Sequence, residues 1–154
     1  MLLTADILLQ FEQKNTVNFA NMTKVLTAGV FDLIHRGHVE LFRRAKEQGD
    51  YLTVLVHADE FIRKPGVIQS TEERVFMCKA IRYVDDALPY GNLDEDVPKM
   101  DFDVYVCGED QLAFPHVQSV RRWCEEHSKL FVVLPRTPEL SSASLRHQIA
   151  EMDH

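Results

Sequence analysis

The sequence predicts an α/β fold: a single Rossmann-like, doubly wound, five-stranded parallel sheet with helices on both faces. Five short segments are apolar throughout instead of alternating, which is typical of parallel strands covered on both sides. Helix-patterned segments separate them, and such crossovers are right-handed. The 154 residues suit one domain. We therefore expect a domain over 24–154, preceded by an N-terminal arm or extension over 1–23 in which a short amphipathic helix could form.

The first half of the domain alternates strand and helix. The first apolar segment leads into a helical pattern that Gly49 stops. After the second apolar segment, a long connection with Pro65 and Gly66 precedes a helix that opens on the capping box of Ser70 and Glu73. In order, we expect a strand at 24–30, a helix at 38–49, a strand at 51–58, a connection at 59–70 and a helix at 70–84.

The second half continues the alternation after one polar stretch that is irregular or weakly helical. Its elements are expected as a short strand within 85–91, the polar stretch at 92–102, a strand at 103–110, a helix at 114–127, a strand at 129–135, and a loop and helix within 136–152. Ligands in such folds bind beyond the carboxyl ends of the strands, at the switch point. The segment that follows the first strand therefore lies at the expected binding edge.

Composition narrows the function classes. The net charge of −7 argues against nucleic-acid binding, although a few local cations and N–H groups can still hold a phosphate. No apolar run approaches the roughly 18–20 residues that span a bilayer, and the N-terminus lacks the features of a secretory signal. Cys78, Cys107 and Cys124 are odd in number and show no paired spacing, so we interpret them as reduced core thiols of a cytoplasmic protein.

Two histidines flank Arg36 and Gly37 where the first strand gives way to the first helix. Gly37 lets the backbone approach a ligand, and the helix start offers free N–H groups that bind phosphates. His35 and His38 can donate hydrogen bonds to a polyphosphate and stabilise charge on a departing oxygen. The alternatives are surface or capping histidines and a metal site, but zinc needs three or four ligands, and Asp32 and His57 complete no familiar set.

This stretch resembles the signature G-x-F-D-x-x-H-x-G-H of the HxGH nucleotidyltransferase superfamily. The matching residues are Gly29, Phe31, Asp32, His35, Gly37 and His38. The resemblance extends over most of residues 24–150 and is greatest to the small bacterial cytidylyltransferases, with the glycerol-3-phosphate cytidylyltransferases the most similar.

The resemblance implies an enzyme that transfers CMP from CTP to a phospho-alcohol similar to glycerol 3-phosphate, with release of pyrophosphate. It also implies Mg²⁺ carried by the nucleotide, and a homodimer. One alternative is an ATP-dependent adenylyltransferase of the sugar-phosphate or FMN type from the same superfamily. Another is a nucleotide-binding module without catalysis. We expect neither nucleic acid nor membrane as a partner.

The family's roles carry over to matching positions of this chain. The implied catalytic residues are His35, His38, Lys64 and Arg136. The implied nucleotide-binding residues are Gly29, Val30, Phe31, Asp32, Gly37, His38, Gly108, Glu109, Arg136, Ser141 and Ser142, with Asp110 a further candidate for substrate contact. The implied residues for the phosphate substrate are Asp32, Lys64 and Arg74.

Simpler interpretations of these residues stay open. Lys64 could be a solvated loop cation, and Arg74 could form a helix-surface ion pair with Glu73 or with an acid in a neighbouring turn. Ser141 and Ser142 could serve as helix caps.

Two departures from the family weaken the inference to CTP and to glycerol phosphate. Glu139 and Leu140 replace a Gly-Ile pair, and a family tryptophan is absent where this chain has Tyr90 and Leu93. Two pairs of adjacent arginines, Arg43-Arg44 and Arg121-Arg122, are interpreted as solvated helix faces.

Overall fold

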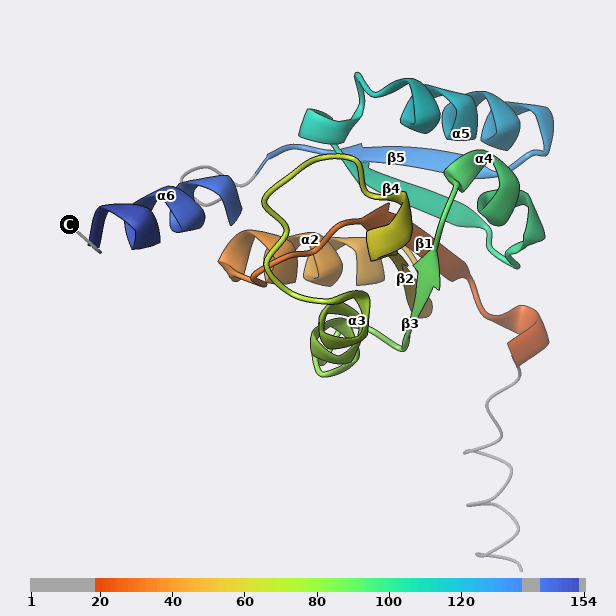
Figure 1. Cartoon of the computed structure of the whole chain (residues 1–154). Coiled ribbons are helices and arrows are strands. Elements are labelled where there is room, and N and C mark those ends of the chain that lie inside the picture. The colour runs from red at the N-terminus through yellow and green to blue at the C-terminus, as the bar shows by residue number, and fades with distance from the viewer. Residues whose placement is uncertain (1–18, 137–141, 153–154) are drawn as a thin grey trace, which may run out of the picture.

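A five-stranded, all-parallel sheet forms the centre of the molecule (Figure 1). The structure is a computed structural model that describes residues 19–136 and 142–152. The strands are β1 (Lys24–Gly29), β2 (Tyr51–His57), β3 (Asp86–Tyr90), β4 (Val104–Gly108) and β5 (Leu130–Leu134). Their order is β3-β2-β1-β4-β5. The predicted doubly wound α/β fold is therefore confirmed, while the helix expected within the first eighteen residues lies outside the described part.

Helices cover both faces of this sheet, with α2 and α3 on one side and α4 and α5 on the other (Figure 1). The helices are α2 (Arg36–Lys46), α3 (Thr71–Lys79), α4 (Leu93–Asp96), α5 (Pro115–Glu126) and α6 (Ser142–Met152). Short 3-10 turns are η1 (Phe19–Asn21), η2 (Asp59–Phe61), η3 (Val97–Lys99) and η4 (Glu109–Gln111). The last helix, α6, lies beyond the carboxyl end of β5 (Figure 1).

Alternate residues of β1 pack into two separate hydrophobic clusters, one on each face of the sheet. Val25 of β1 packs into a cluster with Phe42 of α2, whereas the next residue, Leu26, joins a cluster with Val120 of α5. All four side chains are almost fully buried. Each such burial contributes roughly 1.5–3 kcal/mol to folding. Because both faces are apolar, the strands read as continuous hydrophobic runs in the sequence.

The helix expected over 70–84 is shorter than predicted. It ends at Lys79, and Ala80 is its C-cap. The chain then turns through a hydrogen bond from the Val84 N–H to the Ile81 carbonyl. This turn brings Val84, which is only 9% exposed, into the core below the sheet before β3 begins. Core packing therefore ends the helix although the local sequence is still compatible with one.

The switch point lies between the neighbouring strands β1 and β4, where the chain reverses the direction in which it adds strands to the sheet. The chain leaves β1 toward β2 and β3, then returns to β4 and β5 on the other side of β1. Segments that follow the carboxyl ends of β1 and β4 cannot pack against each other there, so a crevice opens. The expected binding edge and the observed crevice coincide.

Candidate functional site

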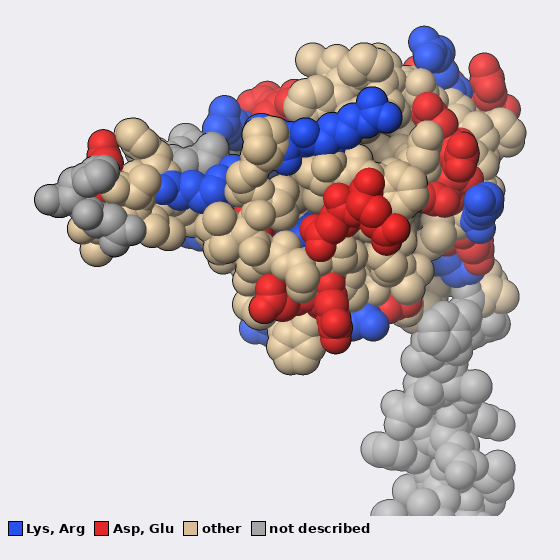
Figure 2. Space-filling view, viewed as in Figure 1, with Lys and Arg blue, Asp and Glu red and all other residues tan. Residues whose placement is uncertain are grey.

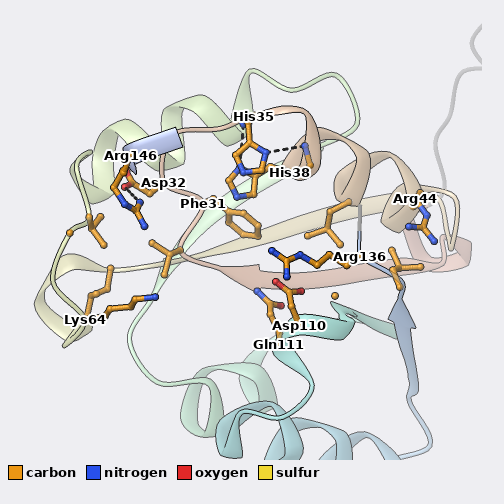
Figure 3. Close-up of a pocket in the computed structure, with 18 of the residues that line it drawn as sticks. Phe31, Asp32, His35, His38, Arg44, Lys64, Asp110, Gln111, Arg136 and Arg146 are labelled. Atoms are coloured by element: carbon orange, nitrogen blue, oxygen red, sulfur yellow. Dashed lines mark hydrogen bonds and ion pairs between the residues drawn. The ribbon is translucent and has the colours of Figure 1, made fainter. Parts of the chain in front are cut away.

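The crevice is a cavity of about 340 Å³ (Figure 3). Its walls come from the turn after β1, the start of α2, the loop between β2 and α3, the ends of β4 and β5, and α6. The lining residues are Val30, Phe31, Asp32, His35, Gly37, His38, Leu41, Arg44, Ile62, Lys64, Pro65, Gly66, Val67, Gly108, Asp110, Gln111, Leu134, Pro135, Arg136 and Arg146. A cavity of this size accommodates a small-molecule ligand.

The turn between β1 and α2 is held in an unusual backbone conformation. Phe31 and Leu33 have positive φ angles of 53° and 49°. Left-handed conformations at residues other than glycine are uncommon and cluster at functional sites. The ring of Phe31 folds back over Gly29, where an added Cβ would lie 2.9 Å from Phe31 Cζ. Gly29 thus lets Phe31 pack edge-on against the ring of His38, with centroids 5.7 Å apart.

His35 and His38 form the capping box of α2. His35 Nδ1 accepts the Gly37 N–H at 3.0 Å, and His38 Nδ1 accepts the His35 N–H at 3.3 Å. The two rings stack with centroids 4.0 Å apart. Because Nδ1 accepts in both rings, the neutral form of each imidazole carries its proton on Nε2. The cap therefore determines which nitrogen of each histidine can donate to a ligand.

The surroundings favour the neutral form of both imidazoles. Burial, and then the neighbouring His35, lower the pKa of His38 to about 4. Burial also lowers the pKa of His35. His35 Nε2 is buried and has no hydrogen-bond partner among the described residues. A buried donor without a partner is costly, so this atom is suited to an oxygen that a ligand brings.

Asp32 holds three parts of the site together. Its carboxylate is 3% exposed and accepts the N–H groups of Ile68 at 2.9 Å and Gln69 at 3.0 Å. Arg146 Nη1 of α6 donates to the same carboxylate at 3.1 Å. The side-chain oxygen of Gln69 in turn accepts the Leu33 N–H. Asp32 thus anchors the loop between β2 and α3, and also α6, to the turn after β1.

Cations surround the cavity although the chain as a whole is acidic. Arg44, Lys64, Arg136 and Arg146 line it, against the carboxylates of Asp32 and Asp110. Arg44 Nη1 donates to the Pro135 carbonyl at 3.0 Å, and the Arg136 N–H donates to Glu109 Oε1 at 2.9 Å.

Both bonds connect the cavity wall to the segment after β5. Oxygen-rich anions are the ligands that such a cluster attracts.

Arg74 is fully buried beside the site and does not line the cavity. Its guanidinium donates to the carbonyls of Val30 (2.8 Å), His57 (2.7 Å) and Gln69 (3.0 Å), and pairs with Asp59 at 2.6 Å. The alternative of a surface ion pair with Glu73 is wrong, because tertiary contacts bury the side chain. The role in substrate binding stays a prediction. The observed contacts join the ends of β1 and β2 to α3.

The other predicted residues divide into three groups. The cavity brings together Val30, Phe31, Asp32, His35, Gly37, His38, Lys64, Gly108, Asp110 and Arg136. Gly29 and Glu109 lie behind its wall, where they support Phe31 and Arg136. Ser141 lies outside the described residues, and of Ser142 only the backbone, at the start of α6, is described.

Sequence reasoning missed Arg44, Gln111 and Arg146, which also line the cavity. Arg44, interpreted from the sequence as part of a solvated helix face, also lines the cavity and donates to the Pro135 carbonyl. Its neighbour Arg43 does not line the cavity and pairs with Glu40 and Glu47 of its own helix region. The sequence carried no local signal for Arg146, because its partner Asp32 lies 114 positions away.

The described residues contain no helix long and apolar enough to cross a membrane. Cys78, Cys107 and Cys124 are buried and free, so their interpretation as core thiols is confirmed.

Comparison with solved structures supports the fold. The lipopolysaccharide core biosynthesis protein of Thermoplasma volcanium superposes with a TM-score of 0.64 at 24% identity, covering 78% of this chain and 100% of that one.

Sequence comparison identifies the family. A family model described as cytidylyltransferase-like matches residues 26–148. The chain is 36% identical over 137 residues to the glycerol-3-phosphate cytidylyltransferase of Staphylococcus aureus, over 86% of this chain and 98% of that protein. It is 42% identical over 94 residues to the FAD synthase of Thermococcus kodakarensis, over 57% of this chain and 63% of that protein. On the family match and the near-complete coverage of the first relative, this chain belongs to the cytidylyltransferase-like family of nucleotidyltransferases.

Proposed function

We propose that this enzyme transfers CMP from CTP to the phosphate of a small phospho-alcohol similar to glycerol 3-phosphate, with release of pyrophosphate. The observation that carries the proposal is the pair of imidazoles at the start of α2, each with Nδ1 occupied by a backbone N–H. Such a pair presents two Nε2 donors to a polyphosphate. Relatives named as glycerol-3-phosphate cytidylyltransferases support the choice of CTP and acceptor.

In this reaction an oxygen of the acceptor phosphate forms a bond to the α-phosphorus of the nucleotide. The bond from that phosphorus to the bridging oxygen breaks, and pyrophosphate leaves with its electron pair. His35 and His38 donate to the oxygens on which charge grows, which lowers the barrier without a covalent intermediate. Lys64 and Arg136 neutralise further charge from opposite walls of the cavity. No proton needs to leave either imidazole.

Magnesium is proposed to arrive with the triphosphate. No cluster of three or more potential protein ligands occurs within 19–136 and 142–152. Mg²⁺ in nucleotide sites keeps several waters and takes its other ligands mainly from phosphates, so this residue set fits it. Asp110 lines the cavity and could add one carboxylate oxygen. When bound, the ion would offset charge on the departing pyrophosphate.

The test is a panel of nucleotides and acceptors. The purified chain is incubated with Mg²⁺, each of the four ribonucleoside triphosphates, and glycerol 3-phosphate, phosphocholine, phosphoethanolamine or FMN. Pyrophosphate release is measured for every combination. We expect release with CTP and a phospho-alcohol. No release in any combination would leave only a nucleotide-binding module.

A second candidate is ATP-dependent adenylyl transfer to FMN or a sugar phosphate. The specific observation in its favour is the 42% identity to an FAD synthase over 94 residues. That match covers less of both chains than the match to the cytidylyltransferases, so we rank it second. Release with ATP and FMN, together with none from CTP, would establish it in place of the first.

We also propose a homodimer in the cytoplasm. Helix α3 contacts the edge strand β3 and exposes Phe76 (71%) and Met77 (37%) to solvent. Contiguous exposed apolar patches mark protein interfaces, and we propose that these two side chains belong to one. Three free, buried cysteines are compatible with a reducing compartment.

A further inference from the structure

The peptide group between Pro135 and Arg136 is held by two side chains of opposite charge. Arg44 Nη1 donates to the Pro135 carbonyl at 3.0 Å, and the Arg136 N–H donates to Glu109 Oε1 at 2.9 Å. The peptide bond is trans, so its carbonyl and N–H lie in one plane and point in opposite directions. Arg44 and Glu109, which we call the peptide clamp, therefore fix the plane of this group from both sides.

The peptide clamp lies at the end of an edge strand. β5 pairs with β4 and has no strand on its other side, and the last pair of their register is Gly108 with Leu134. Beyond this pair the two bonds of the clamp hold the chain. Arg44 comes from α2, and Glu109 is the first residue of η4, directly after β4. Two separate elements thus determine where the chain runs as it leaves the sheet.

Arg136 is the side chain whose direction depends on this peptide group. In Figure 3 it extends into the middle of the cavity beneath the ring of Phe31, whereas Arg44 stays at the edge. A cation stabilises developing charge best when it is held in place beforehand, because no reorganisation is then needed during the reaction. Fixing the backbone of Arg136 provides part of that preorganisation.

Glu109 belongs to the clamp and not to the cavity lining. Its neighbours Asp110 and Gln111 line the cavity, and Glu109 does not. An added Cβ at Gly108 would lie 2.6 Å from Asp110 Oδ1, so the Asp110 carboxylate folds back over Gly108. The two adjacent acids therefore differ: Asp110 lies against the cavity, and Glu109 bonds to the segment after β5.

We propose that Arg44 and Glu109 are positioning residues that act through Arg136, by fixing its peptide group so that its guanidinium meets the departing pyrophosphate. This inference rests on the proposed nucleotidyl transfer and adds two residues that set one of its cations. For Glu109 it replaces the expected direct contact with the nucleotide. It also has an unusual consequence, since loss of an acid should weaken the binding of an anion.

General charge attraction predicts the opposite sign for Glu109. Figure 2 shows Lys and Arg side chains in a band from α6 across the loop between β2 and α3, while acidic side chains gather beside it. In such a field, removal of a nearby carboxylate strengthens the binding of a polyanion. The sign of the effect of Glu109→Ala therefore separates positioning from simple electrostatics.

The first experiment titrates inorganic pyrophosphate into the full chain by calorimetry. Glu109→Ala and Arg44→Gln are each expected to raise its dissociation constant about 5- to 10-fold, because a charge-assisted bond to the Arg136 peptide group is lost. Glu109→Gln keeps an oxygen acceptor and should bind as the wild-type chain does. Glu126→Ala and Arg122→Gln are the matched controls, since both residues lie on α5 and neither lines the cavity.

The second experiment repeats these titrations in an Arg136→Ala background. If the clamp acts through Arg136, neither Glu109→Ala nor Arg44→Gln weakens pyrophosphate binding further there. A further loss as large as in the wild-type background would show direct contact with the anion and overturn the positioning role. Thermal melting of every variant separates loss of folding from loss of binding. If Glu109→Ala does not fold, Arg44→Gln carries the comparison.

Pyrophosphate binding separates this inference from the proposed function, because it requires neither a particular base nor an acceptor. The predicted pattern supports the clamp even if no substrate combination releases pyrophosphate, in which case only the proposed reaction fails. Unchanged or tighter binding in Glu109→Ala contradicts the clamp and leaves the reaction to the substrate panel. A wild-type chain that does not bind pyrophosphate contradicts it as well, because Arg136 would then hold no phosphate.

Discussion

The imidazoles of His35 and His38 stack with ring centroids 4.0 Å apart, and each uses Nδ1 to accept a backbone N–H at the start of α2. Capping boxes are usually built from a hydroxyl and a carboxyl or amide side chain. Here the same cap is built from two catalytic candidates. The helix start and the presentation of two Nε2 donors are therefore one structural feature.

Replacing His38 by alanine should remove a transition-state donor while leaving the fold intact. We expect turnover to fall by about two orders of magnitude or more, measured as pyrophosphate release. His127→Ala, an exposed histidine that bonds to Trp123 of α5, is the control and should keep full activity. Normal turnover in His38→Ala would remove this residue from the catalytic set.

The low pKa of His38 makes folding stability depend on pH in a defined direction. The pKa is about 4 in the folded chain, against an ordinary value of 6.5. As pH falls below 6.5 the unfolded chain binds a proton at this residue, and the folded chain does so only near pH 4. The stability that the neutral His38 imidazole contributes to the folded chain is therefore fully present above pH 6.5 and is lost as pH falls toward 4. Its size is about 3 kcal/mol.

The measurement is urea unfolding of the wild-type chain and of His38→Ala at several pH values in this window. The stability difference between the two proteins should change with pH by an amount of that order. A difference that stays constant between pH 4 and 6.5 would show that His38 is protonated equally in the folded and unfolded chain.

Arg74 should act on stability more than on ligand binding. Arg74→Lys keeps the charge, but one ammonium cannot reach the carbonyls of Val30, His57 and Gln69 together. We expect a loss of about 3 kcal/mol or more in the free energy of unfolding, because buried acceptors lose their donor. Urea unfolding measures it, with the exposed Arg121→Lys as control. Unchanged stability with weaker acceptor binding would instead place the guanidinium in direct contact with substrate.

Lys64 should contribute to the chemical step. Lys64→Ala is expected to lower kcat by one order of magnitude or more, since a cation is lost beside the transferring phosphate. The dissociation constant of the nucleotide should change much less. Arg63→Ala tests the neighbouring exposed cation of the same loop, which does not line the cavity. An equal effect of the two substitutions would indicate general charge attraction and not a specific contact.

Phe76 tests the proposed dimer. Phe76→Ser removes the exposed phenylalanine of α3, which belongs to neither core cluster. We expect the mass in solution, measured by light scattering, to change from two chains to one, while the melting temperature of the monomer stays within a few degrees. A monomeric wild-type chain, or a dimer that survives the substitution, would exclude this face as the interface.

The order of the elements and the histidine pair could be predicted because both are local in sequence. The apolar runs of β1, β2 and β4 are buried on both faces, and such strands need little context to be recognised. His35 and His38 are three residues apart on one helix start. By contrast, α3 ends five residues earlier than expected, because Val84 must reach the core.

Sequence alone determined the turn after β1 and the capped start of α2, because both follow from neighbouring residues, and the phosphate site inferred from them stays a prediction. Only the tertiary structure decided that Arg74 is buried, that Asp32 anchors the loop and α6, and that Arg146 enters the cavity. The physical reason is distance along the chain: Asp32 and Arg146 are separated by 114 positions. No local propensity reports a hydrogen bond between residues that only the packed sheet brings together.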